Sequence, residues 1–293
     1  MFTPIRYIPP IYRPPSEAQS LILPVTDGCS WNRCTFCEMY QTKKFKARKE
    51  EEVLGNIRYA AAVYGKNIRR VFLADGDALV LPTRRLLNIL QTIKTEMPWV
   101  TRVSSYCLPR NLSKKTLAEL KELKEVGLKL AYIGAESGDN AVLNFIQKGE
   151  TFDSTLCALQ KLNEAGIARS VMILNGLGGK NLSQQHAENS ARLANAVNPE
   201  FLAVLVVSFP EGQARLKNNF PGWQMPSSLE LLKEMAQFVG ALNLNNTIFR
   251  SDHASNYLAL KGVLNRDKSA LLKAITTAQN HPEILRAEWQ RGI

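Results

Sequence analysis

Three cysteines lie within nine residues of one another, at Cys29, Cys34 and Cys37. A structural zinc site and an ordinary four-iron cluster both take four protein ligands. No fourth cysteine or histidine lies nearby in the sequence, and three thiolates on a four-iron cluster would leave one iron open to a small molecule. Two other interpretations stay open here, namely three unrelated buried thiols and a zinc site completed by a distant residue.

Three glycine-containing segments follow apolar runs farther along the chain, and each contains polar side chains that could bind a ligand. They are Ala-Asp75-Gly76-Asp77, Gly-Ala-Glu136-Ser-Gly, and Asn175-Gly176-Leu-Gly-Gly. Asp-Gly-Asp is also an ordinary turn sequence, and Glu136 would also suit the N-terminus of a helix. The third segment is not a P-loop, because no Gly-Lys-Ser/Thr follows at the required spacing.

The elements that position these residues alternate between short apolar runs and amphipathic helical patterns, which is typical of β/α units and a parallel sheet. The expected strands cover residues 21–25, 70–73, 101–106, 128–133, 168–174 and 201–207. The helices between them are expected over 50–64, 84–95, 113–127 with Ser113 as N-cap, 140–147, 153–166 with Asp153 as N-cap, and 183–196.

The cysteine loop, with Phe36 between its last two cysteines, resembles the cluster loop of the radical S-adenosylmethionine (radical SAM) superfamily. The usual family spacing is three residues and then two, whereas four residues separate Cys29 from Cys34. The segment around Glu136 is similar to one shared by methylthiotransferases, the Elongator catalytic subunit and oxygen-independent coproporphyrinogen oxidases. The resemblance implies that the three cysteines are the catalytic metal ligands of a [4Fe-4S] cluster whose open iron binds SAM.

The same resemblance implies a set of cofactor-binding residues. Asp77 stands at the acid of the family's Gly-Gly-Glu stretch and would accept hydrogen bonds from the SAM ammonium group, with Asp75 at the usual first glycine. Glu136 would bind a cationic group or support the SAM pocket, because a buried carboxylate is costly unless it is paired. The complete set is Phe36, Asp75, Gly76, Asp77, Glu136, Asn175 and Gly176, the last two lying in the stretch that packs against adenine.

The implied fold class is α/β, a partial (β/α)6 TIM-like barrel with a small, mostly helical C-terminal extension. A complete eightfold barrel or a doubly wound sheet would give similar alternation. The expected organisation is a proline-rich N-terminal extension over 1–20, a radical SAM core over 21–210 and a helical extension over 211–293.

The extension carries an open question about substrate. Residues 248–257 bring Arg250, Asp252, His253 and Tyr257 together, ahead of helices expected over 268–277 and 283–291. This segment either lines the barrel mouth, where His253 or Tyr257 would donate a proton or hydrogen atom, or closes the barrel bottom. A helix starting at the capping box Ser227 to Glu230 precedes it.

Composition favours an enzyme of a reducing cytosol, because five cysteines in 293 residues, three of them clustered, make no disulfide framework. Prolines interrupt the N-terminus before a signal sequence could form, and no run of about 18 apolar residues predicts a membrane span. The net charge of +11 favours an anionic substrate. The basic run from Lys43 to Lys49 is expected to be a solvated surface segment.

The sequence therefore predicts a radical SAM enzyme that cleaves SAM to a 5′-deoxyadenosyl radical and abstracts hydrogen from an unidentified substrate. Its electron would come from a partner such as flavodoxin or ferredoxin. Two alternatives are a non-catalytic nucleic-acid-binding protein with a structural zinc site and a redox carrier whose cluster has no open iron.

Overall fold

The computed structural model describes residues 4–291 and divides into two compact units. Of the described residues, the first unit contains 4–32, 39–133 and 158–169, and the second contains 33–38, 134–157 and 170–291. Neither unit is one continuous piece of chain. The boundary passes between Cys29 and Cys34, so the cysteine loop contributes to both units.

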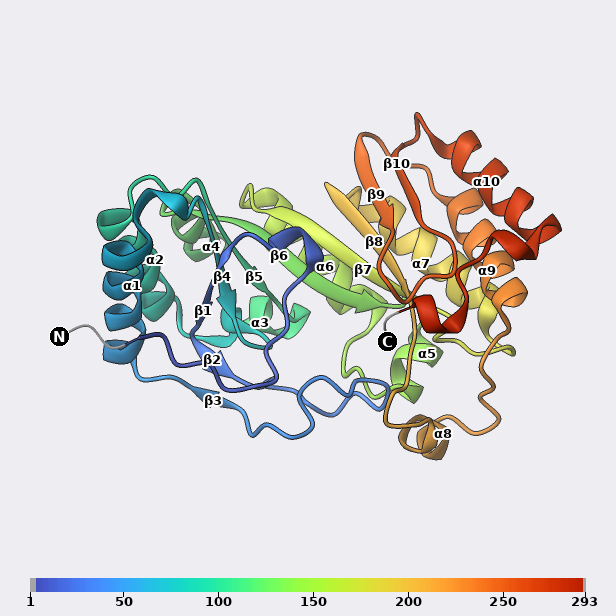
Figure 1. The fold of residues 1–293 in the computed structure, drawn as a ribbon, viewed down its shortest axis with the longest axis horizontal. Coiled ribbons are helices and arrows are strands. Elements are labelled where there is room, and N and C mark those ends of the chain that lie inside the picture. Colours follow the sequence, from blue (N-terminus) through green and yellow to red (C-terminus); the bar gives the residue numbers. More distant parts are fainter. Residues whose placement is uncertain (1–3, 292–293) are drawn as a thin grey trace. The chain divides into compact units, whose positions relative to one another are not determined.

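The first unit contains parallel strands in the order β1-β4-β5-β6 (Figure 1). These are β1 (Leu21–Pro24), β4 (Arg70–Ala74), β5 (Arg102–Tyr106) and most of β6 (Leu128–Glu136). The connecting helices are α1 (Glu50–Tyr64), α2 (Thr83–Glu96), α3 (Pro109–Ser113) and α4 (Leu117–Glu125), and a small antiparallel ladder joins β2 (Thr26–Asp27) to β3 (Lys46–Ala47).

One face of these strands carries an aromatic cluster. Phe72 lies 5.0 Å from Tyr106 and 6.0 Å from Tyr132 between ring centroids, with the rings edge to face. The 3-10 turn Pro15–Glu17 covers this face, because the Tyr132 hydroxyl donates to Glu17 at 2.6 Å and Arg102 pairs with the same carboxylate at 2.7 Å. The N-terminal extension is therefore packed into the first unit.

The second unit contains strands in the order β7-β8-β9-β10. They are β7 (Ala168–Asn175), β8 (Phe201–Val206), β9 (Thr247–Ser251) and β10 (Leu260–Leu264), of which the first three are parallel and β10 is antiparallel to β9. The helices are α5 (Asn140–Phe145), α7 (Ser183–Val197), α8 (Ala214–Asn219), α9 (Ser228–Ala241) and α10 (Lys268–Asn280), and α6 (Phe152–Glu164) belongs to both units.

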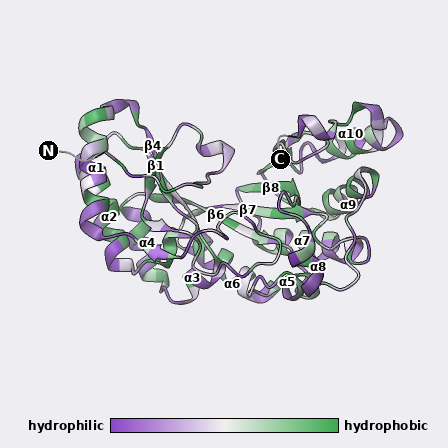
Figure 2. Ribbon diagram, turned by 60° about the horizontal axis from the view of Figure 1, so that its bottom comes forward, coloured by the Kyte–Doolittle hydropathy of each residue, from purple (hydrophilic) through white to green (hydrophobic). Residues whose placement is uncertain are grey.

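Helices α7, α9 and α10 pack side by side and cover one face of this sheet, as Figure 1 shows for α9 and α10. The covered face is visible in side-chain contacts: Asn175 of β7 donates to Leu231 O of α9 at 3.1 Å, and Phe249 of β9 is fully buried. In Figure 2 helices such as α2 and α10 carry hydrophilic and hydrophobic residues together, as amphipathic helices on a sheet do.

The α/β fold class and all six predicted parallel strands are confirmed, and three helix predictions are wrong at their ends. The helix expected from Ser113 is two helices, because Thr116 and Glu119 form a capping box that starts α4 afresh. Helix α6 begins at Phe152, so Asp153 lies in its first turn and is not its N-cap. Residues 283–291 contain only the 3-10 turns Pro282–Ile284 and Glu288–Gln290.

Strands β9 and β10 were not predicted at all. Residues 248–257 were expected to be a polar segment of a helical extension. In the structure Thr247–Ser251 is a strand that pairs with both β8 and β10. The alternation of Ile248, Phe249 and Arg250 is a strand signal, and the density of polar residues after it obscured that signal.

Candidate active site

The three cysteines of the loop are free of disulfide bonds and partly exposed. Cys29 belongs to the first unit, whereas Cys34 and Cys37 belong to the second.

Two aspartates after β4 hold the backbone on either side of Cys29. Gly28 N–H donates to Asp75 Oδ2 at 3.2 Å, and Ser30 N–H donates to Asp77 Oδ1 at 2.9 Å. Gly76 lies against the same stretch, because a Cβ at this position would stand 2.7 Å from Cys29 Cα. The Asp-Gly-Asp segment therefore positions Cys29.

Asp77 holds the backbone that follows Cys29. Its carboxylate is fully buried and accepts hydrogen bonds from the backbone N–H and hydroxyl of Ser30 and, at 3.3 Å, from the Asn111 amide. Burial raises the pKa of Asp77, and the hydrogen bonds from Ser30 and Asn111 act in the opposite direction. Binding of the SAM ammonium group by Asp77 stays a prediction.

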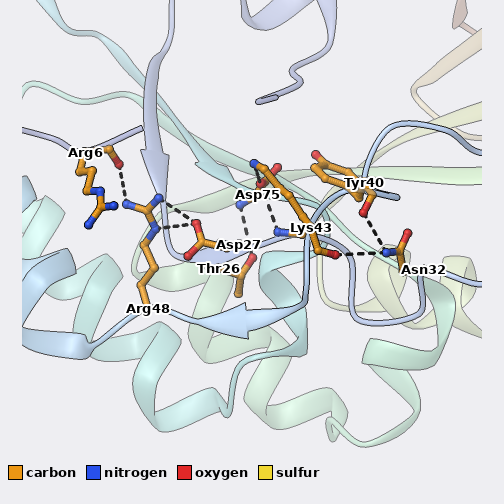
Figure 3. A network of polar contacts seen from close by, with 9 residues as sticks. Arg6, Thr26, Asp27, Asn32, Tyr40, Lys43, Arg48 and Asp75 are labelled. Carbon is orange, nitrogen blue, oxygen red and sulfur yellow. Dashed lines mark hydrogen bonds and ion pairs between the residues drawn. The ribbon is translucent and has the colours of Figure 1, made fainter. Parts of the chain in front are cut away.

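Asp75 forms a buried ion pair with a lysine of the segment after the cysteine loop. Its Oδ2 pairs with Lys43 Nζ at 2.7 Å, while its Oδ1 is buried (Figure 3). The Tyr40 hydroxyl lies next to this carboxylate, and the pKa of Tyr40 is raised by burial, then by the charge of Asp75 and by hydrogen bonding to it. Asp75 Oδ1 can therefore accept from the Tyr40 hydroxyl or from a ligand that takes its place.

The basic run after the loop is not a uniformly solvated segment, and that prediction is corrected at two positions. Lys43 is 8% exposed and pairs with Asp75, and Arg48 is 3% exposed and pairs with Asp27 at 2.8 Å (Figure 3). Lys44, Lys46 and Lys49 are exposed as expected. The sequence gives no sign of which lysine turns inward, because the partner Asp75 is 32 residues away.

The second part of the loop is a tight turn attached to the second unit. Cys37 N–H donates to Cys34 O at 3.3 Å, Thr35 N–H donates to Ile146 O at 2.9 Å, and Arg215 donates to Cys37 O at 2.9 Å. Phe36 packs against the apolar cluster that contains Ile146 and Trp223. In the described structure Phe36 anchors this turn, and its predicted cofactor contact remains a prediction.

A buried ion pair lies beside this turn. Lys148 Nζ contacts Glu136 Oε1 at 2.9 Å, and the two side chains are 5% and 6% exposed. Burial lowers the pKa of Lys148, but Glu136 and the neighbouring Cys34 and Cys37 together raise it well above its ordinary value. A buried positive charge therefore lies beside the turn that carries two of the three thiols.

Glu136 is placed by local backbone structure at the end of β6. It has a left-handed φ of 65°, and its carboxylate folds back over Gly134, where a Cβ would stand 2.1 Å from Glu136 Oε1. The alternative of Glu136 as a helix N-terminal residue is wrong, because Asp139 is the N-cap of α5. Its second oxygen, Oε2, is buried without a hydrogen-bond partner and can accept from a bound ligand.

The glycine-rich turn after β7 uses its polar groups within the chain. The Asn175 amide donates to Leu231 O at 3.1 Å, and Gly176 N–H donates to Glu234 Oε1 at 2.6 Å. The Asn175 side-chain N–H and the Gly176 backbone N–H are therefore already used within the chain, and a contact with adenine would involve other atoms of this turn. The predicted roles of Asn175 and Gly176 in binding the cofactor stay predictions.

His186 of α7 is a residue that the sequence analysis missed. It is 1% exposed, its Nδ1 lies 2.7 Å from Ser137 Oγ, and its Nε2 lies 3.0 Å from Leu174 O. It thereby links the segment after β6 to the strand before the glycine-rich turn. A single histidine on an amphipathic helix carries no sequence signal for this bridging position.

The segment 252–257 follows the carboxyl end of β9, which is parallel to β8. The alternative in which this segment closes the barrel bottom is therefore wrong, because ligand-binding residues and loops of parallel sheets gather at this same edge. His253 Nδ1 accepts from Ser255 N–H at 3.1 Å, whereas the Tyr257 hydroxyl donates to Glu288. The His253 Nε2 atom is thus not used in these hydrogen bonds, whereas the Tyr257 hydroxyl is bonded to Glu288 within the protein.

The residues present fit an iron–sulfur cluster in their donor chemistry. The loop supplies three thiols that form no disulfide, and a buried lysine lies beside two of them. In the part of the chain from residue 4 to 291, no three His, Cys, Asp or Glu side chains have the arrangement of a metal site. The joint use of Cys29, Cys34 and Cys37 as ligands therefore stays a prediction.

Comparison with known proteins gives the family. The model of the radical SAM superfamily matches residues 23–194, which include the cysteine loop and the segments after β4, β6 and β7. A sequence search of curated proteins finds no significant match.

Three solved structures show the fold. Coproporphyrinogen III oxidase (HemN) from Escherichia coli, described as a radical SAM enzyme, is 15% identical with a TM-score of 0.58 over 75% of this chain and 52% of that one. Methylornithine synthase (PylB) is 16% identical, with a TM-score of 0.53 over 87% of this chain and 68% of that one. The methyltransferase TsrM from Kitasatospora setae, solved with cobalamin and a [4Fe-4S] cluster, is 19% identical, with a TM-score of 0.51 over 63% and 36%.

The chain thus spans about a third of TsrM and about half of HemN. The similarities confirm the predicted fold class, a partial TIM-like barrel. Because the family model covers more than half of the sequence, together with its cluster loop, the chain belongs to the radical SAM superfamily, whose enzymes use a [4Fe-4S] cluster and SAM.

Proposed function

We propose that this chain is an enzyme that binds one [4Fe-4S] cluster through Cys29, Cys34 and Cys37 and uses SAM to abstract hydrogen from a substrate. The observation that carries the proposal is the family match, which includes the loop of Cys29, Cys34 and Cys37. The buried ion pair of Lys148 and Glu136 accompanies the part of this loop that belongs to the second unit.

A cluster held by Cys29, Cys34 and Cys37 would supply the single electron that reductive cleavage of SAM to methionine and a 5′-deoxyadenosyl radical requires. The chain's own residues hold and orient the groups around this step. Asp75 and Asp77 fix the backbone of Cys29, and in the second unit Glu136 Oε2 is a buried acceptor without a hydrogen-bond partner among the described residues. A carboxylate acceptor of this kind suits an ammonium group such as that of SAM's methionine.

The proposal includes an electron-transfer partner and a cellular location. The electron would come from a flavodoxin or a ferredoxin, and an oxygen-sensitive cluster would be kept in a reducing cytosol. Among residues 4–291, no helix has both the length and the apolar character needed to cross a bilayer. The alternative of a zinc-holding nucleic-acid-binding protein is not supported, because the matched family consists of cluster-containing enzymes.

The test is anaerobic reconstitution with iron and sulfide, reduction with dithionite, and electron paramagnetic resonance with and without SAM, with 5′-deoxyadenosine assayed in the same samples. We expect a reduced-cluster signal that changes when SAM is added, together with 5′-deoxyadenosine. A cluster indifferent to SAM would mean a redox carrier, and a protein that holds zinc in place of iron would overturn the proposal.

Cysteine variants provide the matched control. Cys34→Ala and Cys37→Ala should each abolish the cluster signal and 5′-deoxyadenosine. Cys157→Ala, which changes an exposed thiol outside the loop, should retain both. Equal iron content in all three variants would show that the loop does not hold the cluster.

A further inference from the structure

One face of the sheet in the second unit is apolar yet partly exposed. Over residues 168–173 of β7 and along β8 burial alternates residue by residue, with the helix-covered positions buried and the others partly exposed, whereas Leu174 and Asn175 are both buried. In β9 the same alternation ends in the exposed Arg250, and in β10 Lys261 is exposed. We call the side opposite α7, α9 and α10 the open face.

The strand registers define which residues share this face. One row across the four strands is Ser170, Phe201, Ile248 and Val263. The next row, nearer the carboxyl ends of β7, β8 and β9, is Met172, Ala203, Arg250 and Lys261. The first row therefore has three apolar residues and Ser170, and the second has two apolar and two cationic residues.

Gly262 and Phe249 confirm the assignment of the two faces. They are register partners, Phe249 is fully buried, and a Cβ on Gly262 would stand 3.3 Å from Leu271 of α10. Since neighbouring residues of a strand point to opposite faces, Arg250 and Lys261 point away from the helices. Their alkyl chains can lie along the apolar rows while their charges remain in water.

The two cations are not equivalent. Lys261 Nζ pairs with Asp252 at 3.0 Å, which offsets its charge. The one hydrogen bond found for the Arg250 side chain in residues 4–291 goes to the neighbouring Phe249 O at 3.3 Å. Arg250 is therefore the cation on this face whose guanidinium can take an anionic group, and guanidinium binds carboxylate or phosphate oxygens in pairs.

We propose that the open face binds the substrate of the enzyme, and that this substrate is an amphipathic anion. Its apolar part would lie on Met172, Phe201, Ile248 and Val263, and its anionic group would pair with Arg250. Ala203 lies between Met172 and Arg250 in the row and leaves room where the two parts of such a molecule join. The inference rests on the proposed function and adds the chemical class of its substrate.

The test uses a pair of probes that differ in charge and share their apolar chain. Octanoate and octan-1-ol are titrated by isothermal calorimetry into the reconstituted full-length protein in the absence of SAM. We expect octanoate to bind about tenfold more tightly than octan-1-ol, since one charge-assisted contact corresponds to about that ratio. Equal affinities would overturn the proposal.

Three variants separate the charge from the apolar surface. Arg250→Gln should bring octanoate affinity down to that of octan-1-ol, whereas Ile248→Asn should weaken both probes. Arg266→Gln is the matched control, because Arg266 is an exposed arginine of the same unit that already pairs with Asp267 at 2.8 Å. An equal effect of Arg250→Gln and Arg266→Gln would reduce the preference to general surface charge and overturn the proposal, provided that thermal unfolding shows both variants folded.

The outcome is separable from that of the proposed function. The calorimetry needs no SAM cleavage, and the electron paramagnetic resonance test needs no substrate. A SAM-dependent signal without octanoate preference would overturn the amphipathic-anion inference alone. An octanoate preference without a SAM-dependent signal would leave a binding face in a protein whose proposed reaction is wrong.

Discussion

The two units differ in what covers the helix-free face of their strands. In the first unit the rings of Phe72, Tyr106 and Tyr132 and the fully buried Glu17 pack on this face, and of the three rings Tyr106 is partly exposed. In the second unit the corresponding side chains of β8 and β9 are not covered: Phe201, Ala203 and Ile248 are partly exposed and Arg250 is exposed.

On the proposed function, this difference assigns a structural role to the strands of the first unit and substrate binding to those of the second. Side chains packed on both sides of a strand leave no room for a ligand, and any change in volume there is costly. A molecule that covers a partly exposed apolar face removes that surface from water, and this burial contributes favourably to its binding free energy. On this argument the first unit fixes Cys29 and its two aspartates, and the second unit selects the substrate.

The largest expected effect comes from replacing a phenylalanine by alanine on the helix-free face of each unit and comparing the two costs. Phe72→Ala removes a fully buried ring and should lower the free energy of unfolding by about 3 to 5 kcal/mol. Phe201→Ala removes a partly exposed ring and should cost at most about 2 kcal/mol, because less apolar surface returns to water. Urea unfolding followed by circular dichroism measures both, and equal costs would mean that the open face is part of the core.

The next test compares a buried lysine with an exposed one inside the second unit. Lys148→Met leaves Glu136 buried without its counter-ion and should cost about 3 kcal/mol. Lys261→Met breaks an ion pair whose lysine side chain is 61% exposed and should cost less than about 1 kcal/mol.

A double variant decides whether the first of these costs comes from the unpaired charge. Glu136→Gln combined with Lys148→Met removes both charges, and its unfolding cost should be smaller than the sum of the two single costs. Additive costs in urea unfolding would show that Glu136 and Lys148 do not stabilise one another.

Most elements of the fold were predictable, because they depend on local patterns. The α1 helix has the predicted bounds, Glu50–Tyr64, and the capping box at Ser227 starts α9 as expected. The errors come from competing local signals: Thr116 and Ser113 both suit an N-cap, and the polar residues after Ser251 obscured β9 and β10.

The site was predictable in its residues and much less in their roles. Sequence order locates the acids after β4 and β6, but it does not show that Ser30 and Asn111 already satisfy Asp77. Lys43 and Lys148 were missed as partners because their carboxylates, Asp75 and Glu136, lie 32 and 12 residues away. Such pairings depend on tertiary packing, which residue types and spacing do not specify.

A pair of glycine variants tests how tightly the first unit packs around Cys29. Gly76→Ala would place a Cβ 2.6 Å from Gly28 O, so the loop must shift, at a cost of about 1 to 3 kcal/mol and with loss of bound iron. Gly55→Ala in α1 has nothing within 4 Å of the new Cβ and should stabilise by about 0.5 to 1 kcal/mol. Iron content and thermal unfolding of the two variants measure this, and normal iron content in Gly76→Ala would contradict close packing at the loop.

The smallest expected effect is a pH dependence at the carboxyl edge of the second unit. Burial lowers the pKa of His253 from 6.5, with the Asp252 charge acting to raise it and Arg286 acting to lower it. The folded chain therefore resists protonation that the unfolded chain accepts, so the contribution of His253 to stability is complete above about pH 6.5 and is lost as the pH falls through the lowered pKa. His253→Gln should flatten this part of the stability curve between about pH 6.5 and 5, measured by urea unfolding at each pH. An equally steep decline in that variant would assign the pH dependence to other groups and leave His253 a solvent-facing side chain.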